Sequence, residues 1–347
     1  MIRNSEKGLR IFFVIIVTFR DFYYYISMKN LLKTIILLLL IISLSACISN
    51  KIDTALSGAD KNGIPNKAKS GGNNMMLPLL GESDTKLMED FFPTALKLYE
   101  ILHTQNPKHQ GLSAMTGSLY VMYANAFVQT NADMMPLEML EEQQAEINRA
   151  KLHYLRGRDY CFEAFEGRYP GFTENIKSND EEKINKATSM LKKTDVSNAY
   201  WAGAGWLGAF GVDPLNVDIL YGIRGAVSLL EKACQLDPGY NKGAIWEVLT
   251  AFYAAAPADF GGDDERAKFC YEKALECSGG NSISQHILYA QSFCIPNQDV
   301  KGFDEAIEKA LAINPDEDPA TRLATTVSKR KAEFLKSRRD ELFIIWE

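Results

Sequence analysis

The chain has 347 residues, 46% of them hydrophobic, and a net charge of −6 at pH 7. This acidic balance does not favour nucleic acid as a partner, because affinity for nucleic acid comes mainly from neutralised phosphates. The length is sufficient for one large hydrophobic core or two smaller ones.

The first notable segment runs from Leu31 to Asn50, with the sequence LLKTIILLLLIISLSACISN. Its unbroken apolar part begins at Ile35 and fades by Ser45. That is short for a membrane-spanning helix, which needs about 20 apolar residues, and it fits the apolar region of a signal peptide. The segment ends in Leu-Ser-Ala-Cys47, which resembles the bacterial lipobox, where the cysteine is lipidated and becomes the first mature residue. We predict lipidation at Cys47; a plain membrane anchor is the alternative.

Three regions follow from this reading. Met28-Lys29-Asn30 looks like the usual start of a signal peptide, so residues 1–27 are interpreted as the result of a start codon placed too early. Without residues 1–46 the chain has 32 basic and 42 acidic residues, a balance of −10. Residues 47–82 are rich in Gly, Asn, Ser and Lys and read as a flexible tether. The predicted organisation is an N-terminal extension with a lipoprotein signal peptide (1–46), a tether (47–82) and a helical repeat domain (83–347).

From Asp84 onward almost every segment has helical periodicity, and we find no alternating runs bounded by hairpin turns. The sequence therefore predicts an all-α fold. Pro93 is expected to open the first helix, and Pro107 lies beyond its end. Five cysteines follow Cys47 without a CxxC pair, and most are expected in the core, although one disulfide is possible. Later helices are expected near 111–129, 136–165, 182–191, 199–210, 217–236, 243–255, 264–277, 282–293, 303–313 and 319–345.

Three of these helices share a motif: Ala or Phe, a large apolar residue four positions later, Ala three further on, and Pro or Gly five beyond that. The motif resembles the second helix of a tetratricopeptide repeat, in which small residues let two helices approach closely. It predicts a tetratricopeptide-like solenoid with cryptic repeats; generic antiparallel helices are the alternative. The three copies are Ala226, Leu230, Ala233 and Pro238; Ala267, Tyr271, Ala274 and Gly279; and Phe303, Ile307, Ala310 and Pro315.

Signals of catalysis are sparse. The four histidines are scattered, and the chain has no HExxH, GxSxG or GxxxxGK[ST] motif. Gly203–Gly208 matches GxGxxG, but no strand-like segment precedes it, so close helix packing beside Trp201 and Trp206 is the better explanation. We therefore expect no enzyme activity, no cofactor and no metal.

Two apolar helices contain polar residues that need partners. Asn125 lies between Tyr123 and Phe127, and a lone buried Asn without hydrogen bonds costs about 1–3 kcal/mol. Arg156 lies in an aromatic helix together with Arg158 and Asp159. Each residue either contacts a ligand or links neighbouring helices, and both explanations remain open from the sequence.

Seven stretches occur in an order that is more specific than any one of them. They are Leu44–Cys47, LYVMYANAFVQ (119–129), YLRGRDYCFEAF (154–165), YWAGAGWLGAFG (200–211), LLEKACQLDPGYNKGAIWEVL (229–249), PADFGGDDERAKFCYEKALE (257–276) and RLATTVSKRKAEFL (322–335). Together they resemble the TatT family, the lipoprotein T component associated with tripartite ATP-independent periplasmic (TRAP) transporters. The resemblance implies an all-helical protein with cryptic repeats that forms a homotrimer and associates with a cognate periplasmic solute-binding protein, with apolar solutes as suggested ligands. Gly279 departs from the pattern, because the middle repeat lacks its Pro.

The combined prediction is a lipid-anchored, periplasm-facing accessory protein of a TRAP uptake system, bound to a solute-binding protein and to an apolar or amphipathic ligand. Ile48 follows Cys47, where inner-membrane retention often uses Asp, and this favours the outer membrane. The alternative is a general tetratricopeptide scaffold lipoprotein for envelope protein assembly. The predicted ligand-binding residues are Asn125, Arg156, Tyr160, Trp201 and Trp206.

Overall fold

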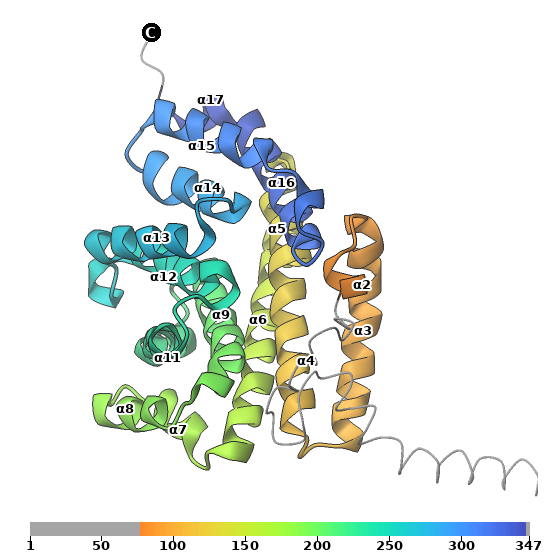
Figure 1. Ribbon diagram of the computed structural model, residues 1–347, viewed down its shortest axis with the longest axis vertical. Helices are drawn as coiled ribbons and strands as arrows, with labels where there is room; N and C mark the ends of the chain where they lie inside the picture. Colours follow the sequence, from red (N-terminus) through yellow and green to blue (C-terminus); the bar gives the residue numbers. More distant parts are fainter. Residues whose placement is uncertain (1–76, 345–347) are drawn as a thin grey trace, which may run out of the picture. The chain divides into compact units, whose positions relative to one another are not determined.

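The computed structural model describes residues 77–344, and within this range the chain forms helices and turns but no strand (Figure 1). This confirms the predicted all-α fold. The α-helices are α2 (Leu77–Leu80), α3 (Thr85–Gln105), α4 (Gln110–Tyr123), α5 (Thr130–Asp133), α6 (Leu140–Arg168), α7 (Phe172–Ile176), α8 (Glu181–Ser189), α9 (Val196–Val212), α10 (Val217–Tyr221), α11 (Ile223–Leu236), α12 (Ala244–Ala255), α13 (Asp264–Ser278), α14 (Ile283–Tyr289), α15 (Val300–Ala312), α16 (Arg322–Ser337) and α17 (Arg339–Leu342). Short 3-10 turns separate several of them, and π-helical turns continue α4 (Ala124–Gln129) and α14 (Ala290–Cys294).

Helix α3 begins eight residues before Pro93, so the expectation that Pro93 opens it was wrong. Asp84 caps the helix by accepting a hydrogen bond from the Leu87 backbone N–H at 2.9 Å. A proline inside a helix removes one hydrogen bond and costs about 3 kcal/mol. Burial of Phe92 before Pro93 and of Leu96 after it offsets this cost.

Helices α4, α6 and α9 form the centre of the core, and they cross at glycines. A Cβ atom on Gly117 would lie 2.6 Å from the Gly157 carbonyl oxygen, and one on Gly205 would lie 2.9 Å from the Tyr154 carbonyl oxygen. A Cβ atom on Gly208 would lie 2.7 Å from the Tyr154 ring. The GxGxxG stretch is therefore a helix-packing surface, as predicted, although the aromatic residue against it is Tyr154 and not a tryptophan.

The predicted helix over residues 217–236 is interrupted at Gly222, which separates α10 from α11. A Cβ atom at this position would lie 2.0 Å from Trp206 Cζ2. The buried Trp206 indole donates from Nε1 to the Ile219 carbonyl oxygen at 3.2 Å. The break allows the chain to pass over this large side chain.

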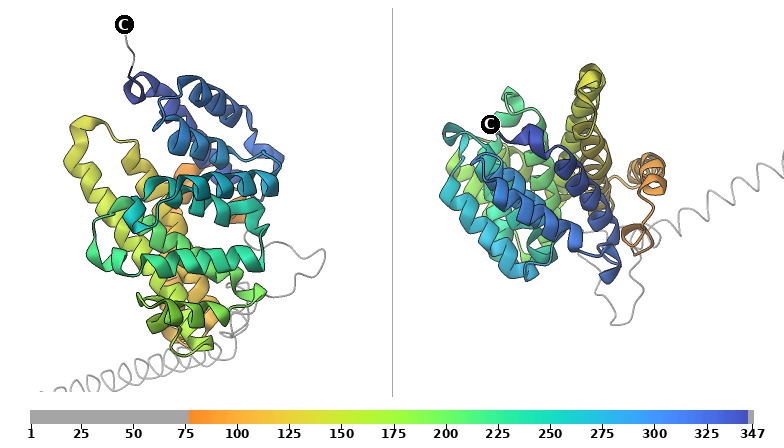
Figure 2. Two further views of the ribbon diagram at one scale, coloured as in Figure 1. Left: turned by 90° about the vertical axis from the view of Figure 1, so that its left-hand side faces the viewer. Right: turned by 90° about the horizontal axis from the view of Figure 1, so that it is seen from above.

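The aligned repeat motif falls on α11, α13 and α15, which lie beside α9, α12 and α14 respectively (Figure 2). This arrangement is compatible with tetratricopeptide-like pairs. Gly279 ends α13 in the left-handed conformation (φ 68°), which explains how the middle copy ends without Pro. All the predicted alanine contacts are fully buried: Ala226, Ala233, Ala267, Ala274 and Ala310.

Helix α16 connects the C-terminal helices to the N-terminal ones. Its first half (Leu323, Val327) belongs to the main hydrophobic cluster, and its second half (Ala332, Leu335) to a smaller cluster with α14 and α15. Arg322 Nη1 donates to the Gly81 carbonyl oxygen at 3.0 Å, just after α2. The short helix α2, inside the predicted tether, therefore packs on the helical domain.

The remaining predictions concern single residues and the N-terminus. All five cysteines after position 47 are free thiols, and four of them are buried. Within residues 77–344 no helix is long and apolar enough to cross a membrane. Cys47, the signal peptide (1–46) and most of the tether lie outside the described residues.

Candidate functional site

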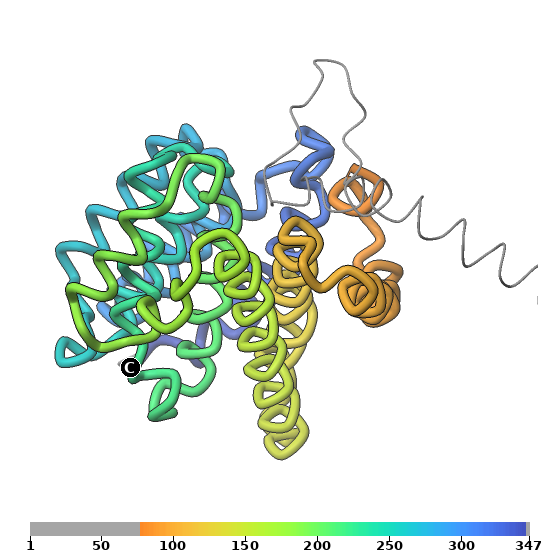
Figure 3. The backbone as a smooth tube through the Cα atoms, turned by 90° about the horizontal axis from the view of Figure 1, so that it is seen from below, coloured from red at the N-terminus to blue at the C-terminus, as the bar shows by residue number. Residues whose placement is uncertain are grey.

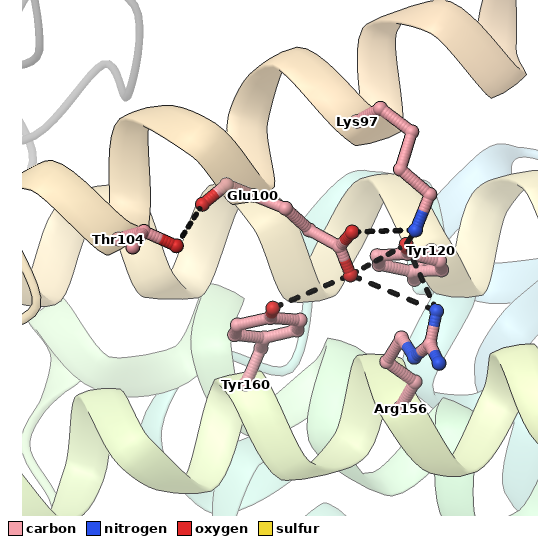
Figure 4. A network of polar contacts seen from close by, with 6 residues as sticks. All are labelled: Lys97, Glu100, Thr104, Tyr120, Arg156 and Tyr160. Carbon is pink, nitrogen blue, oxygen red and sulfur yellow. Dashed lines mark hydrogen bonds and ion pairs between the residues drawn. The ribbon is translucent and has the colours of Figure 1, made fainter.

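Glu100 lies at the centre of a polar network that joins α3, α4 and α6 (Figure 4). Its carboxylate accepts hydrogen bonds from Lys97 Nζ at 2.6 Å and from the Tyr120 hydroxyl at 2.7 Å. The Tyr160 hydroxyl is 3.4 Å away and Arg156 Nη1 3.7 Å away. Burial alone would raise the pKa of Glu100, but Lys97, Tyr120 and Arg156 stabilise the anion and hold that pKa below its ordinary value.

Arg156 is the least tightly held member of this network. Its Nη1 donates to the Tyr120 hydroxyl at 3.3 Å, and its guanidinium lies 5.4 Å from the centre of the Tyr120 ring. Half of the side chain is exposed (50%). A guanidinium has five N–H donors. Glu100 does not depend on them alone, because Lys97 and Tyr120 hold its carboxylate through shorter bonds. Arg156 therefore retains guanidinium donors beyond the one that contacts Tyr120.

A row of cationic and aromatic side chains extends from Arg156 along the same face of α6. Arg149, His153 and Arg156 are spaced four and three residues apart, so they lie above one another on the helix. The His153 ring stacks on Tyr120 at 5.6 Å and meets the edge of Tyr123 at 5.5 Å. We call the surface formed by these five residues the α6 cation row.

The charges around His153 make this row electropositive. Burial, together with the nearby charges of Arg149, Arg156 and Lys97, lowers the pKa of His153 to about 4, and the opposing charge of Glu146 offsets only part of this shift. The imidazole is therefore neutral at pH 7 and is surrounded by three cations. Arg149 and Arg156 lie about one helical turn to either side of His153 on α6.

An open pocket of about 460 Å³ adjoins the row where Arg149 and Tyr123 line both. The buried side chains of Phe127 and Val128 form its apolar base. Arg149 is held there by Glu146 at 2.7 Å and by the Tyr123 hydroxyl at 2.6 Å. The other lining residues are Glu89, Asn131, Met135, Glu142 and Ala145.

The predicted ligand residues divide between two faces of α6. Tyr160 joins Arg156 in the Glu100 network and stacks on Tyr120 at 6.1 Å; burial, together with the Glu100 charge, raises its pKa to about 12. Asn125 instead donates to the Tyr154 hydroxyl at 3.1 Å. Tyr154 and Arg156 are two residues apart, or about 200° around the helix, so they face opposite sides.

Asn125 lies in the π-helical turn that follows α4, and the residue is exposed. The Tyr154 hydroxyl that it contacts donates in turn to Gln129 Oε1 at 2.6 Å. Asn125 is thus both hydrogen-bonded and accessible, in a type of turn that is frequent at functional sites. The structure does not bring it together with Arg156.

The two tryptophans lie on α9, which packs against the Tyr154 side of α6. Trp206 is 1% exposed and contacts Phe162 and Arg158 at 5.6 and 5.2 Å, so it is a core residue. Trp201 is half-buried and meets the Tyr200 ring at 4.8 Å. Neither indole belongs to the Glu100 network or the α6 cation row.

Several members of the site were not predicted from the sequence. Arg149 and His153 could have been found from their spacing to Arg156, which places all three on one helical face. Glu100 and Tyr120 come from α3 and α4, and only the packing of those helices brings them to Arg156.

Arg158, the other arginine of this segment, forms an ion pair with Asp159 at 2.9 Å, and Lys177 reaches the same carboxylate at 3.1 Å. Only 11% of the Arg158 side chain is exposed. Across residues 77–344, no group of three His, Cys, Asp or Glu side chains is placed to hold a metal ion.

Comparison with known proteins agrees with the resemblance noted in the sequence. The family model described as "TRAP transporter T-component" matches residues 81–343. A protein of Treponema pallidum (strain Nichols), named "Uncharacterized protein", is 43% identical over 263 residues, which cover 76% of this chain and 81% of the relative. The chain therefore belongs to the TRAP transporter T-component family.

Proposed function

We propose that this chain is a lipid-anchored, periplasm-facing accessory protein of a TRAP solute uptake system. It binds the cognate periplasmic solute-binding protein and holds an amphipathic ligand with an acidic head group. Family membership supports the role in uptake. The single observation that supports the ligand is the loosely held Arg156, half exposed beside the α6 cation row.

The proposed ligand places its head and tail in different parts of the site. The carboxylate lies over His153 between Arg149 and Arg156, where three cations, including Lys97, offset its charge. The tail extends past Tyr123 into the apolar base of the pocket, whose volume is in the usual range for small-molecule sites. The rim glutamates repel an anionic head from the pocket and keep it at the cation row.

Binding in this proposal breaks no bond. An enzyme would need converging nucleophilic or acid–base groups around a substrate. The cation row instead presents a neutral imidazole, two guanidiniums and two phenol rings, which suit recognition of an anion. We therefore propose a binding protein without catalytic activity or cofactor.

The ligand is tested with decanoate, a carboxylate with an apolar tail. Purified protein is incubated with decanoate and analysed by native mass spectrometry, together with the variant Arg156→Gln. We expect retention to fall in this variant while the circular dichroism spectrum is unchanged, because Lys97 and Tyr120 still hold Glu100.

The matched control is Arg224→Gln, which removes one exposed charge from α11, away from the site. Its retention of decanoate should equal that of the wild type. Unchanged retention in Arg156→Gln, or unfolding of that variant, would show that Arg156 only links helices. Equal retention of decylamine by the wild type would contradict an acidic head group.

Anchoring is tested at Cys47, in the segment outside the described residues. Radiolabelled palmitate should mark the wild type and not Cys47→Ala, because the thiol carries the lipid. Equal labelling of both would contradict lipidation there. Fractionation of the labelled wild type should place it in the outer membrane, which Ile48 after Cys47 favours over the inner one.

The partner is tested with the solute-binding protein of the same transport system. That protein should elute together with the purified chain in size-exclusion chromatography, and the resemblance implies a homotrimer as the binding unit. The alternative function, a scaffold for envelope protein assembly, would leave the solute-binding protein unbound. It would also leave decanoate retention unaffected by Arg156→Gln.

A further inference from the structure

A second cavity lies between α14 and α15, on different helices from those of the candidate site. Its volume is about 450 Å³, which is in the usual range for small-molecule sites. The turn after α13, His286 of α14 and the end of α15 form its walls. Helix α13, which leads into this turn, lies on the side of the described helices opposite α3 (Figures 1 and 3). We call this space the α14–α15 cavity, and it is separate from the α6 cation row.

Two opposite charges line the α14–α15 cavity without meeting each other. Lys309 lies in the last turn of α15, and Glu317 lies in the 3-10 turn Pro315–Glu317 that follows. Within residues 77–344 neither side chain forms an ion pair or a hydrogen bond. Glu305, four residues before Lys309, would be its usual helical partner, but it lies 3.8 Å from Lys301 Nζ instead. An ammonium and a carboxylate therefore both remain available to a ligand in the cavity.

A third polar group comes from the turn between α13 and α14. Gly279 and Gly280 have φ values of 68° and 74°, in the left-handed region that glycine adopts at little cost. This turn brings Asn281, the next residue, to the wall of the cavity. An amide offers both donors and an acceptor, and in the described part of the chain the Asn281 side chain has no hydrogen-bond partner.

The rest of the wall is uncharged. Burial, together with the nearby charge of Lys309, lowers the pKa of His286, and a hydrogen bond with the Gly280 backbone offsets only part of this shift. The imidazole is therefore neutral at pH 7. Ala312 and Ile313 add a short apolar surface at the end of α15. The α14–α15 cavity thus combines one ammonium, one carboxylate, one amide and an apolar wall.

We propose that the α14–α15 cavity binds a free α-amino acid with an apolar side chain. The carboxylate of the amino acid accepts hydrogen bonds from Lys309 and Asn281, its ammonium group donates to Glu317, and its side chain packs on Ile313. A zwitterion pairs with both charges at once, whereas a simple anion or cation would pair with one and be repelled by the other. This site goes beyond the proposed transport role and does not depend on it.

The proposal is tested by isothermal titration calorimetry of the full chain, purified in detergent, with L-leucine. We expect saturable binding at millimolar concentration. Two analogues separate the charges, because 4-methylpentanoate lacks the ammonium group and leucinamide lacks the carboxylate. Each analogue should bind at least roughly tenfold more weakly than L-leucine. Equal binding of either analogue would contradict recognition of both charges.

Variants of the chain test the same pairing from the protein side. Lys309→Gln and Glu317→Gln should each raise the dissociation constant of L-leucine at least roughly tenfold, and both should keep the wild-type circular dichroism spectrum because the two side chains are exposed. Lys301→Gln is the control, since Lys301 is 88% exposed on the same helix and lies outside the cavity wall.

Arg156→Gln should bind L-leucine like the wild type, so failure of this site and failure of the decanoate site are distinguishable. The proposal is overturned if the wild type shows no saturable binding of L-leucine. It is equally overturned if Lys309→Gln and Glu317→Gln bind L-leucine as tightly as the wild type does.

Discussion

Substitution of Gly157 by alanine tests the close crossing of α4 and α6 directly. A Cβ atom at this position would lie 2.7 Å from the Gly117 carbonyl oxygen and 2.7 Å from Val121 Cγ2. Neither neighbour can move aside cheaply, since one belongs to the backbone of α4 and the other to a β-branched side chain. We expect Gly157→Ala to destabilise the protein.

The magnitude follows from two opposing effects. Alanine in place of glycine inside a helix favours folding by about 1 kcal/mol. Ordinary contact begins at 3.4 Å, so α4 and α6 must separate by about 0.7 Å from the present 2.7 Å. Overpacking of this kind typically costs about 1–3 kcal/mol, and separation also loosens the fully buried Cys161 and Tyr120 nearby. The steric cost outweighs the helix preference, and the expected net loss is up to about 2 kcal/mol.

The assay is urea unfolding followed by circular dichroism, with Gly211→Ala as the matched control. Gly211 lies in α9, is exposed, and has no atom within 4 Å of an added Cβ. There the helix preference acts alone, so Gly211→Ala should raise stability by up to about 1 kcal/mol. The two substitutions are chemically identical and should shift the midpoint in opposite directions. Equal stabilisation by both would refute a tight crossing at Gly157.

Two further predictions concern the repeat contacts and pH. Ala233→Leu and Ala274→Leu should each lower the free energy of unfolding in urea by about 1–3 kcal/mol, because both alanines are fully buried. Ala251→Leu is the control and should cost little, because Ala251 is exposed. Equal midpoints for all three variants would contradict the repeat alignment. Burial, with the nearby cationic charges, lowers the pKa of His153 to about 4 in the folded protein. The unfolded chain therefore binds this proton at a higher pH, about 6.5, than the folded protein does. The free energy of unfolding should fall as the pH decreases from about 6.5 toward about 4. His153→Gln should lose less stability than the wild type between neutral and mildly acidic pH; an identical loss would show that other groups control it.

The helical content and the buried alanines could be predicted because both depend on local periodicity. Residues three and four apart share a helix face, so the pattern of apolar residues indicates each helix and its buried side. Ala226, Ala233 and Ala274 were placed at helix contacts for this reason, and all three are fully buried. The same reasoning failed at Pro93 and Gly222, where burial of Phe92 and the position of Trp206 override the local preference.

The candidate site was predictable only in part. Arg156 and Tyr160 are four residues apart on one helix, and they do belong to one network. Whether Asn125 and the two tryptophans lie near them depends on which helix covers each face of α6, and no local sequence pattern gives this. Since α3 and α4 cover the Arg156 face and α9 covers the Tyr154 face, the predicted residues separate.

The sequence by itself determined the fold class and the family resemblance. These depend on composition, periodicity and the order of short stretches along one chain. Only the tertiary structure decided that Glu100 is the carboxylate facing Arg156, because these residues lie on different helices and no local pattern links them. The physical reason is that helix packing, through close crossings such as Gly117 on Gly157, selects which distant side chains meet.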